Sequence, residues 1–354
     1  MSFSQSIFTK LVRLWGHISL RRRRQYFFLI SLTMVCALLE IVSLSAVIPF
    51  ITVISNPEGL SKYPLITDTI GSFGITKNSD LVLIICIGFM LVALLAGGMR
   101  ILLIWMSIHI VNSTSRDISD KVLKRILYQP YSVHIANNSS EVISSLVKKI
   151  DSSTSTISAS VNIIISTLLF TSIITTVFVV NYMVAIGSVV VFGSTYLFIA
   201  WLTRYRVANN GQTIVKEQGN MIKTIQEALG GIRDVLLDGT QAIYCKTYHK
   251  SNSISLRANG ENVFLNSSPR YIMEMLGMVL IASIAMFINY QSNNSVIALP
   301  MLGVLALGAQ RSLPLMQQLY GGWTTLLASK AALGDVLVLL DQPLPEQIDL
   351  SLQK

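Results

Sequence analysis

The sequence predicts an all-α membrane protein with six transmembrane helices and long cytoplasmic helical extensions. Hydrophobic residues make up 52% of its 354 residues and charged residues only 13%, about half the charged share of a soluble domain. Mean hydropathy is +0.59. Apolar runs of the roughly 20 residues that a helix needs to cross a bilayer recur along the chain. Together these observations indicate a polytopic helical membrane protein.

The apolar runs divide the chain into three parts. Residues 1–25 precede the first run, residues 26–327 hold the spans and two long polar segments (112–156 and 202–270), and residues 328–354 form a helical extension and linker. The six predicted spans are Tyr26–Ile54, Leu81–Val111, Ile157–Asn181, Met183–Trp201, Tyr271–Tyr290 and Val296–Leu327.

The distribution of Lys and Arg predicts the orientation of the spans. Three segments are basic: 1–25 and 112–156 hold six cations each, and 202–270 holds nine. Segment 55–80 holds two, and the turns 181–183 and 291–295 hold none. The positive-inside rule then places both termini in the cytoplasm. We expect a multi-pass protein of the bacterial inner membrane whose net charge of +9 reflects topology, not binding to nucleic acid.

The amino-terminal segment has the pattern of an amphipathic helix. Six apolar residues recur at helical spacing and three basic residues take the opposite face; they are Ile7, Phe8, Leu11, Leu14, Trp15 and Ile18, and Lys10, Arg13 and His17. We expect this helix to lie in the membrane interface, anchored by the arginines at 21–24.

The two long basic segments are predicted to be helical hairpins. In the first, the break at 128–131 contains Pro130, which removes a backbone donor. In the second, Gly230 and Gly231 interrupt a helix, and 238–240 form a turn before another helix. Spans two to five therefore continue beyond the membrane and double back through short transverse pieces.

This plan resembles the transmembrane region of ABC exporters over nearly the whole chain. Local strings are similar to flippases of lipid-linked oligosaccharides and to polysaccharide or glycolipid exporters. The strings are Leu38-Leu39-Glu40-Ile41 with Ile48-Pro49-Phe50-Ile51, Pro269-Arg270-Tyr271 with Glu274 and Gly277, and Arg311 with Pro314.

The resemblance implies a domain-swapped homodimer that moves an amphiphile outward by alternating access. An anionic amphiphile is among the possible substrates. Its partners would be a second copy of the chain, membrane lipids and a nucleotide-binding domain that uses ATP and Mg²⁺. Peptide or drug export on the same fold remains an alternative, as does a non-transporting receptor or scaffold.

The resemblance also implies two coupling helices that dock on the nucleotide-binding domains. On this sequence they fall near Tyr131, Val133, His134 and Asn137, and near Gly239, Gln241 and Tyr244. The alternative is that both pieces only cap helical hairpins.

The chain contains no phosphate-binding loop. Such a loop needs Gly-Lys followed by Ser or Thr, and no Gly-Lys pair occurs. We therefore expect no ATP hydrolysis by this chain and no catalytic, cofactor or metal residues in it. Either the sequence is part of a longer protein or the ATPase is a separate chain.

Charges inside predicted spans are functional candidates because they are costly there. Glu40, Arg100, Glu274 and Arg311 qualify, and Arg270, directly before the fifth span, is a further candidate as a pairing charge. Arg270 and Glu274 are four residues apart and are expected to pair. Arg100 lies either deep in the membrane or at the cytoplasmic end of its span. For Arg311, substrate contact and pairing with Glu40 remain equally open.

Overall fold

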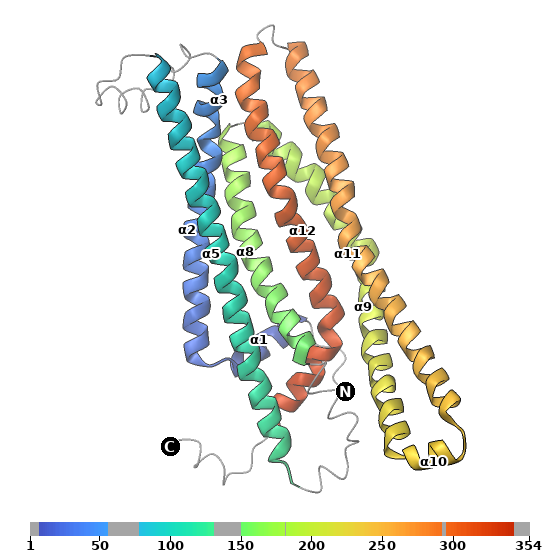
Figure 1. The fold of residues 1–354 in the computed structure, drawn as a ribbon. Helices are drawn as coiled ribbons and strands as arrows, with labels where there is room; N and C mark the ends of the chain where they lie inside the picture. The colour runs from blue at the N-terminus through green and yellow to red at the C-terminus, as the bar shows by residue number, and fades with distance from the viewer. Residues whose placement is uncertain (1–6, 56–77, 131–149, 181, 292–294, 343–354) are drawn as a thin grey trace.

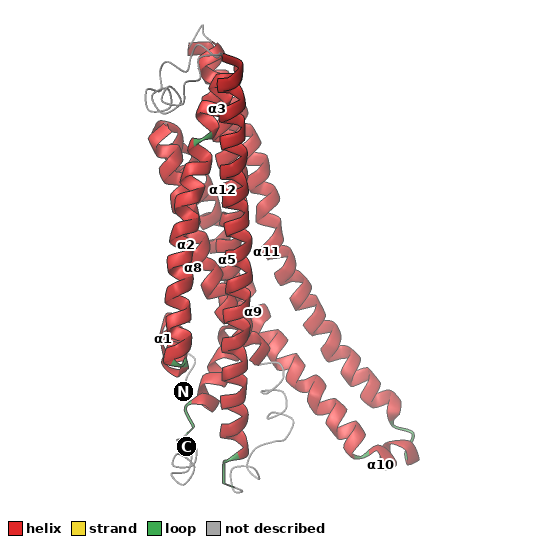
Figure 2. Ribbon diagram, turned by 60° about the vertical axis from the view of Figure 1, so that its left-hand side comes forward, coloured by secondary structure: helices red, strands yellow, loops and turns green. Residues whose placement is uncertain are grey.

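The computed structural model describes residues 7–55, 78–130, 150–180, 182–291 and 295–342, and every regular element in these ranges is an α-helix (Figure 2). The helices are α1 (Ile7–His17), α2 (Leu20–Ser45), α3 (Val47–Ser55), α5 (Asn78–Leu127), α8 (Ile150–Val180), α9 (Tyr182–Gly230), α10 (Ile232–Leu237), α11 (Gln241–Gln291) and α12 (Ser295–Leu340). The predicted all-α fold class is confirmed.

Two groups of helices make up the molecule (Figure 1). In the first, α2, α5, α8 and α12 run side by side. In the second, α9 and α11 pair along their length and diverge from the first group toward the short helix α10 (Figures 1 and 2). Helix α1 packs against α12, at the same end of the molecule as α10. We call this end the α10 end.

Five of the described helices are long and apolar enough to cross a bilayer. They cover Leu20–Val53, Val82–Leu127, Asp151–Val180, Ala185–Gly230 and Leu307–Leu340. The remaining predicted span, Tyr271–Tyr290, lies within α11. The chain is therefore a multi-pass membrane protein.

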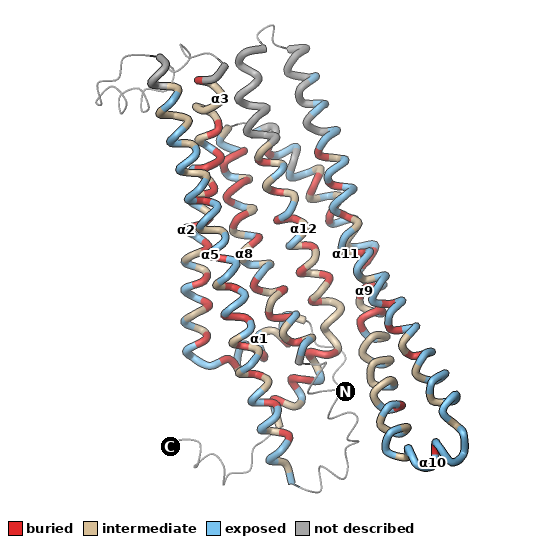
Figure 3. The backbone as a smooth tube through the Cα atoms, viewed as in Figure 1, coloured by how far each residue is buried: buried red, intermediate tan, exposed pale blue. Residues whose placement is uncertain are grey.

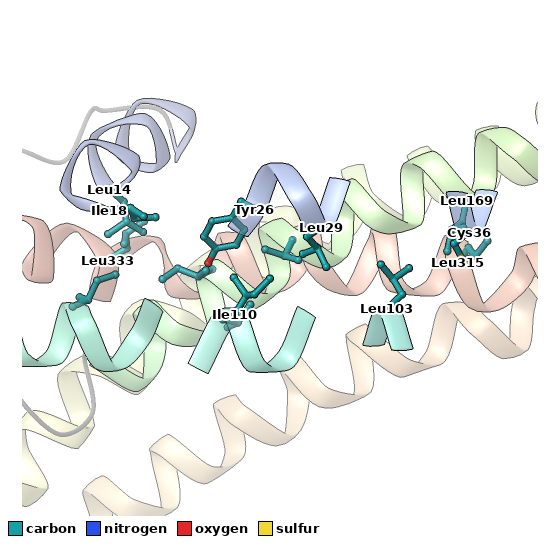
Figure 4. Packing of buried hydrophobic residues seen from close by; sticks show 14 of the residues in the cluster. Leu14, Ile18, Tyr26, Leu29, Cys36, Leu103, Ile110, Leu169, Leu315 and Leu333 are labelled. Atoms are coloured by element: carbon teal, nitrogen blue, oxygen red, sulfur yellow. The ribbon is translucent and has the colours of Figure 1, made fainter. Parts of the chain in front are cut away.

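The buried residues run along the inner faces of the helices (Figure 3). The main cluster joins α1, α2, α5, α8 and α12, and Figure 4 shows Tyr26, Leu29 and Ile110 within it. A second cluster, which includes Phe192, Met273 and Tyr320, joins α9 and α11 to α12. Many large apolar side chains face outward instead, which suits a bundle surrounded by lipid, where outward apolar surface carries no penalty.

Two glycines allow helices to approach α12 closely. A Cβ atom on Gly322 would lie 2.6 Å from the side chain of Ile163 in α8, and one on Gly211 of α9 would overlap the backbone of Ala328. Small residues at such crossings let backbones come together, and van der Waals packing is a main source of helix association in lipid.

Helix α1 differs from the expected interfacial helix in one respect. Lys10, predicted to lie on the polar face, is only 9% exposed, and Leu14 on the same side is 2% exposed. Phe8, predicted to share the apolar face with Leu14, is 72% exposed. The prediction for Lys10 was wrong because its ammonium group donates to the carbonyl of Lys330 at 2.9 Å, a partner that the pattern of α1 alone does not reveal.

Candidate functional site

A cavity of about 870 Å³ lies between α5, α8 and α12. Its wall combines apolar side chains with hydroxyl and amide groups and a single charged residue, Arg100. The polar lining consists of Ser107, Asn112, Thr154, Ser155, Ser158, Asn162, Asn266, Gln317, Gln318 and Thr325. A polar cavity inside an apolar bundle provides hydrogen-bonding groups for a solute that lipid does not solvate.

A second cavity of about 490 Å³ lies between α8, α9, α11 and α12. Its lining includes Asp151, Gln218 and Asn259, and it shares Ser155, Asn266 and Thr325 with the first cavity. The two cavities therefore meet at these three residues and form one polar tract.

Asn266 of α11 holds the junction of the two cavities. Its Oδ1 accepts a hydrogen bond of 3.3 Å from the hydroxyl of Thr324 in α12. The same Oδ1 would lie 2.9 Å from a Cβ on Gly321. The missing side chain at Gly321 therefore leaves room for the amide, and the contact joins the diverging helix pair to α12.

Arg100 is the charged group of the larger cavity. It is partly buried in the wall formed by α5. No hydrogen bond or ion pair joins it to another residue that the structure describes. A guanidinium group with free donors beside hydroxyls and amides is suited to bind phosphate or carboxylate oxygens.

Unlike Arg100, Arg311 forms an ion pair and hydrogen bonds with other described residues. Arg311 Nη1 lies 3.1 Å from Glu40 Oε1, and Nη1 and Nη2 both donate to Ser43 Oγ at 3.3 Å. The Glu40 side chain is 6% exposed and that of Arg311 is 28% exposed. Of the two roles considered for Arg311, the geometry matches pairing, which joins α12 to α2 by an ion pair inside the membrane.

The expected pair of Arg270 and Glu274 does not form. Both side chains are exposed on α11, and within the described part of the chain no ion pair connects them. Helix spacing alone does not hold two exposed charges together, because an exposed pair gains at most about 0.5 kcal/mol.

The predicted coupling segments can be located only in part. Tyr131, Val133, His134 and Asn137 lie outside the described residues. In the second hairpin the short transverse helix is α10, earlier than the predicted segment: Gly239 is a turn residue with φ of +64°, and Gln241 and Tyr244 already belong to α11. Glycine favours this left-handed conformation, so it ends α10 instead of continuing it.

Sequence reasoning missed most of the cavity wall. On α8, Thr154, Ser155, Ser158 and Asn162 recur at three- and four-residue spacing, which places them on one face of the helix. This polar stripe next to an apolar span was a visible signal. The contribution of Asn266 had no such signal, since it depends on how α11 packs against α12.

Comparison with known families identifies the chain. The family model for the ABC transporter transmembrane region matches residues 25–310, which include α5, α8, α9 and the cavity residues up to Asn266. Among curated proteins no significant match is found. The matched region is the membrane part of such transporters and not their ATPase. The chain belongs to the family of ABC transporter transmembrane regions.

Proposed function

We propose that the chain is the membrane subunit of an ATP-driven flippase that moves a lipid-linked saccharide, a glycolipid or a related anionic amphiphile outward. The observation that supports this proposal is the larger cavity of the polar tract, whose charged lining residue is Arg100. Hydroxyl and amide groups suit a sugar-bearing head group, and the guanidinium of Arg100, which pairs with no described residue, suits a phosphate attached to it. The lipid tail would remain beside the outward-facing apolar residues of the bundle.

The transport cycle requires partners. We propose that two copies of the chain form the pathway and that nucleotide-binding domains using ATP and Mg²⁺ dock at the α10 end. The count of Lys and Arg supports a cytoplasmic α10 end and cytoplasmic termini in the bacterial inner membrane. Closure of the ATPase domains would then rock the helices between inward- and outward-facing states.

The diverging helix pair suits this role. Helices α9 and α11 extend away from the bundle and carry α10 at their tip (Figures 1 and 2). On α10, Leu236 and Leu237 are 62% and 73% exposed. Exposed apolar residues at the tip of a polar hairpin are the kind of surface that a soluble partner covers, and a stiff helix pair would transmit that partner's motion to the cavity.

A flipping assay tests the proposal. The transporter, purified together with its ATPase, is placed in proteoliposomes with a fluorescent polyprenyl-diphosphate saccharide, and the ATP-dependent change of leaflet is measured by access of an impermeant glycosidase. Arg100→Gln should slow flipping about tenfold or more, the loss expected for a charge-assisted hydrogen bond to phosphate. Arg270→Gln, which removes an exposed arginine, is the matched control and should change the rate less than twofold.

The outcomes separate the alternatives. Equal rates for the two variants would contradict the role of Arg100. ATP-dependent movement of a fluorescent peptide but not of the saccharide lipid would favour a peptide exporter, and movement of neither would favour a receptor or scaffold.

A further inference from the structure

The carboxyl end of α1 is capped by cations from other helices. Arg23 Nη2, from the first turn of α2, donates to the carbonyl oxygens of Trp15 at 2.8 Å and Gly16 at 3.1 Å. Lys121 Nζ, from α5, donates to the carbonyl oxygen of His17 at 2.6 Å. The last carbonyls of a helix have no partner within it and attract positive charge. Helix α1 is therefore fixed to α2 and α5 at this end.

The same helix binds the end of α12. Arg13 Nη2 lies 2.6 Å from Asp341 Oδ2, and His17 Nε2 lies 2.9 Å from Asp341 Oδ1. Asp341 directly follows the last residue of α12, and its amide still donates to the carbonyl of Leu337 at 2.9 Å. A carboxylate at the carboxyl end of a helix is unfavourable by itself. The guanidinium of Arg13 compensates for it, and the contacts from Arg13 and His17 together hold the last turn of α12 in place.

Packing supports this contact. Leu14 and Ile18 belong to the same buried cluster as Leu333 of α12 (Figure 4). The ammonium group of Lys10 donates to the carbonyl of Lys330 and occupies space that a Cβ on Gly334 would fill, 2.5 Å away. The contact thus combines apolar burial, a buried cation and an ion pair.

The opposite face of α1 is exposed in the part of the chain that the structure describes. Phe8 is 72% exposed and Val12 is 57% exposed. Phe8 and Val12 are four residues apart, so their side chains lie on the same face of the helix. Leu20 and Phe27, at the start of the first span, are also apolar and exposed. Exposed apolar residues on α1 and on the start of the span that follows it fit a lipid leaflet that covers the outer face of α1.

We infer that α1 is a latch: its outer face lies in the lipid leaflet, and its inner face holds the end of α12 through Asp341. Through this latch, the seating of α1 in the leaflet determines whether the last turn of α12 stays helical and in which direction the chain leaves the bundle. The importance of that direction for a following ATPase domain rests on the proposed function. The latch itself does not.

Hydrogen exchange of the chain in nanodiscs made of phosphatidylglycerol and phosphatidylethanolamine tests the latch. Arg13→Gln and Asp341→Asn should each speed amide exchange in 335–341 by about threefold to fivefold, the change expected when an ion pair near the surface is lost. The double variant should exchange no faster than the faster single variant, because both remove one interaction. Arg21→Gln, which removes a nearby exposed cation, is the matched control and should leave 335–341 unchanged.

A substitution on the lipid-facing side of α1 provides the more specific test. Phe8→Asp touches no latch residue on α12, yet unseating α1 from the leaflet should also speed exchange in 335–341. Exchange that rises in α1 alone, or an Arg13→Gln variant that behaves like Arg21→Gln, would overturn the inference. A latch that passes these tests in a chain that moves no lipid would leave the inference standing and reject only the proposed function.

Discussion

Replacing Arg311 by Met, which keeps a long side chain and removes the charge, should destabilise the bundle strongly. The substitution leaves the carboxylate of Glu40, 6% exposed, without its cation inside the membrane. Breaking a buried ion pair by removing one partner costs about 3–5 kcal/mol. Ser43 loses both hydrogen bonds from the guanidinium as well, so we expect a loss of at least about 3 kcal/mol in the free energy of unfolding.

Removing the charge of Glu40 instead of that of Arg311 should lower the free energy of unfolding by less. Glu40→Gln keeps a hydrogen-bond acceptor for Arg311, whose side chain is 28% exposed and so less buried than that of Glu40. We expect a loss of about 1–2 kcal/mol. The double variant Glu40→Gln with Arg311→Met removes the unpaired carboxylate and should recover at least about 1 kcal/mol relative to the sum of the single changes.

Equilibrium unfolding in mixed detergent micelles measures these differences. Arg270→Met on the exposed face of α11 is the matched control and should stay within about 0.5 kcal/mol of the unchanged protein. A strictly additive double variant, or an Arg311→Met variant as stable as the control, would refute the structural role. If the Arg311→Met variant were stable but inactive in flipping, substrate contact would be the correct role.

Three further predictions concern topology, packing and coupling. In a background without the native cysteines, an impermeant maleimide on intact cells should label a cysteine at Lys62 but not one at Asp238, and the reverse pattern would invert the orientation. Gly322→Leu should destabilise the bundle by about 1–3 kcal/mol in the same unfolding assay because the added atoms meet Ile163, and an unchanged stability would mean that α8 and α12 are farther apart. Leu237→Asp on α10 should abolish flipping and the stimulation of ATP hydrolysis by substrate without changing the melting temperature, whereas normal coupling would leave α10 as a mere hairpin cap.

The sequence allowed the spans to be predicted because a bilayer imposes a simple requirement on them. About 20 apolar residues are needed whatever the neighbouring helices do. Helices α5 and α9 contain the predicted runs 81–111 and 183–201, and α8 contains 157–180 of the third. The pairing of Arg311 with Glu40 was foreseeable as one of two roles, since a charge inside a span needs a partner or water.

The features that depend on tertiary contacts could not be predicted in this way. Lys10 appeared to be a surface cation because its partner, the carbonyl of Lys330, is distant in sequence. The pair of Arg270 and Glu274 was expected from spacing alone, but both side chains are exposed on α11 and no ion pair joins them within the described part of the chain. The position of α10 depended on which of several closely spaced glycines ended a helix, and only Gly239 adopts a positive φ.

The proposed function requires that the polar tract is a transport path whose access changes with ATP. Asn162 on α8 lines the larger cavity, so a cysteine there, in a background without native cysteines, reports on access directly. In the complete transporter, an impermeant methanethiosulfonate added from the α10 end should modify Asn162→Cys rapidly without nucleotide. Modification should be at least about tenfold slower in the ATP- and vanadate-trapped state, in which the helices have rocked outward, while an exposed control, Glu261→Cys on α11, should react at similar rates in both states. Equal rates at position 162 with and without trapped nucleotide would contradict the claim.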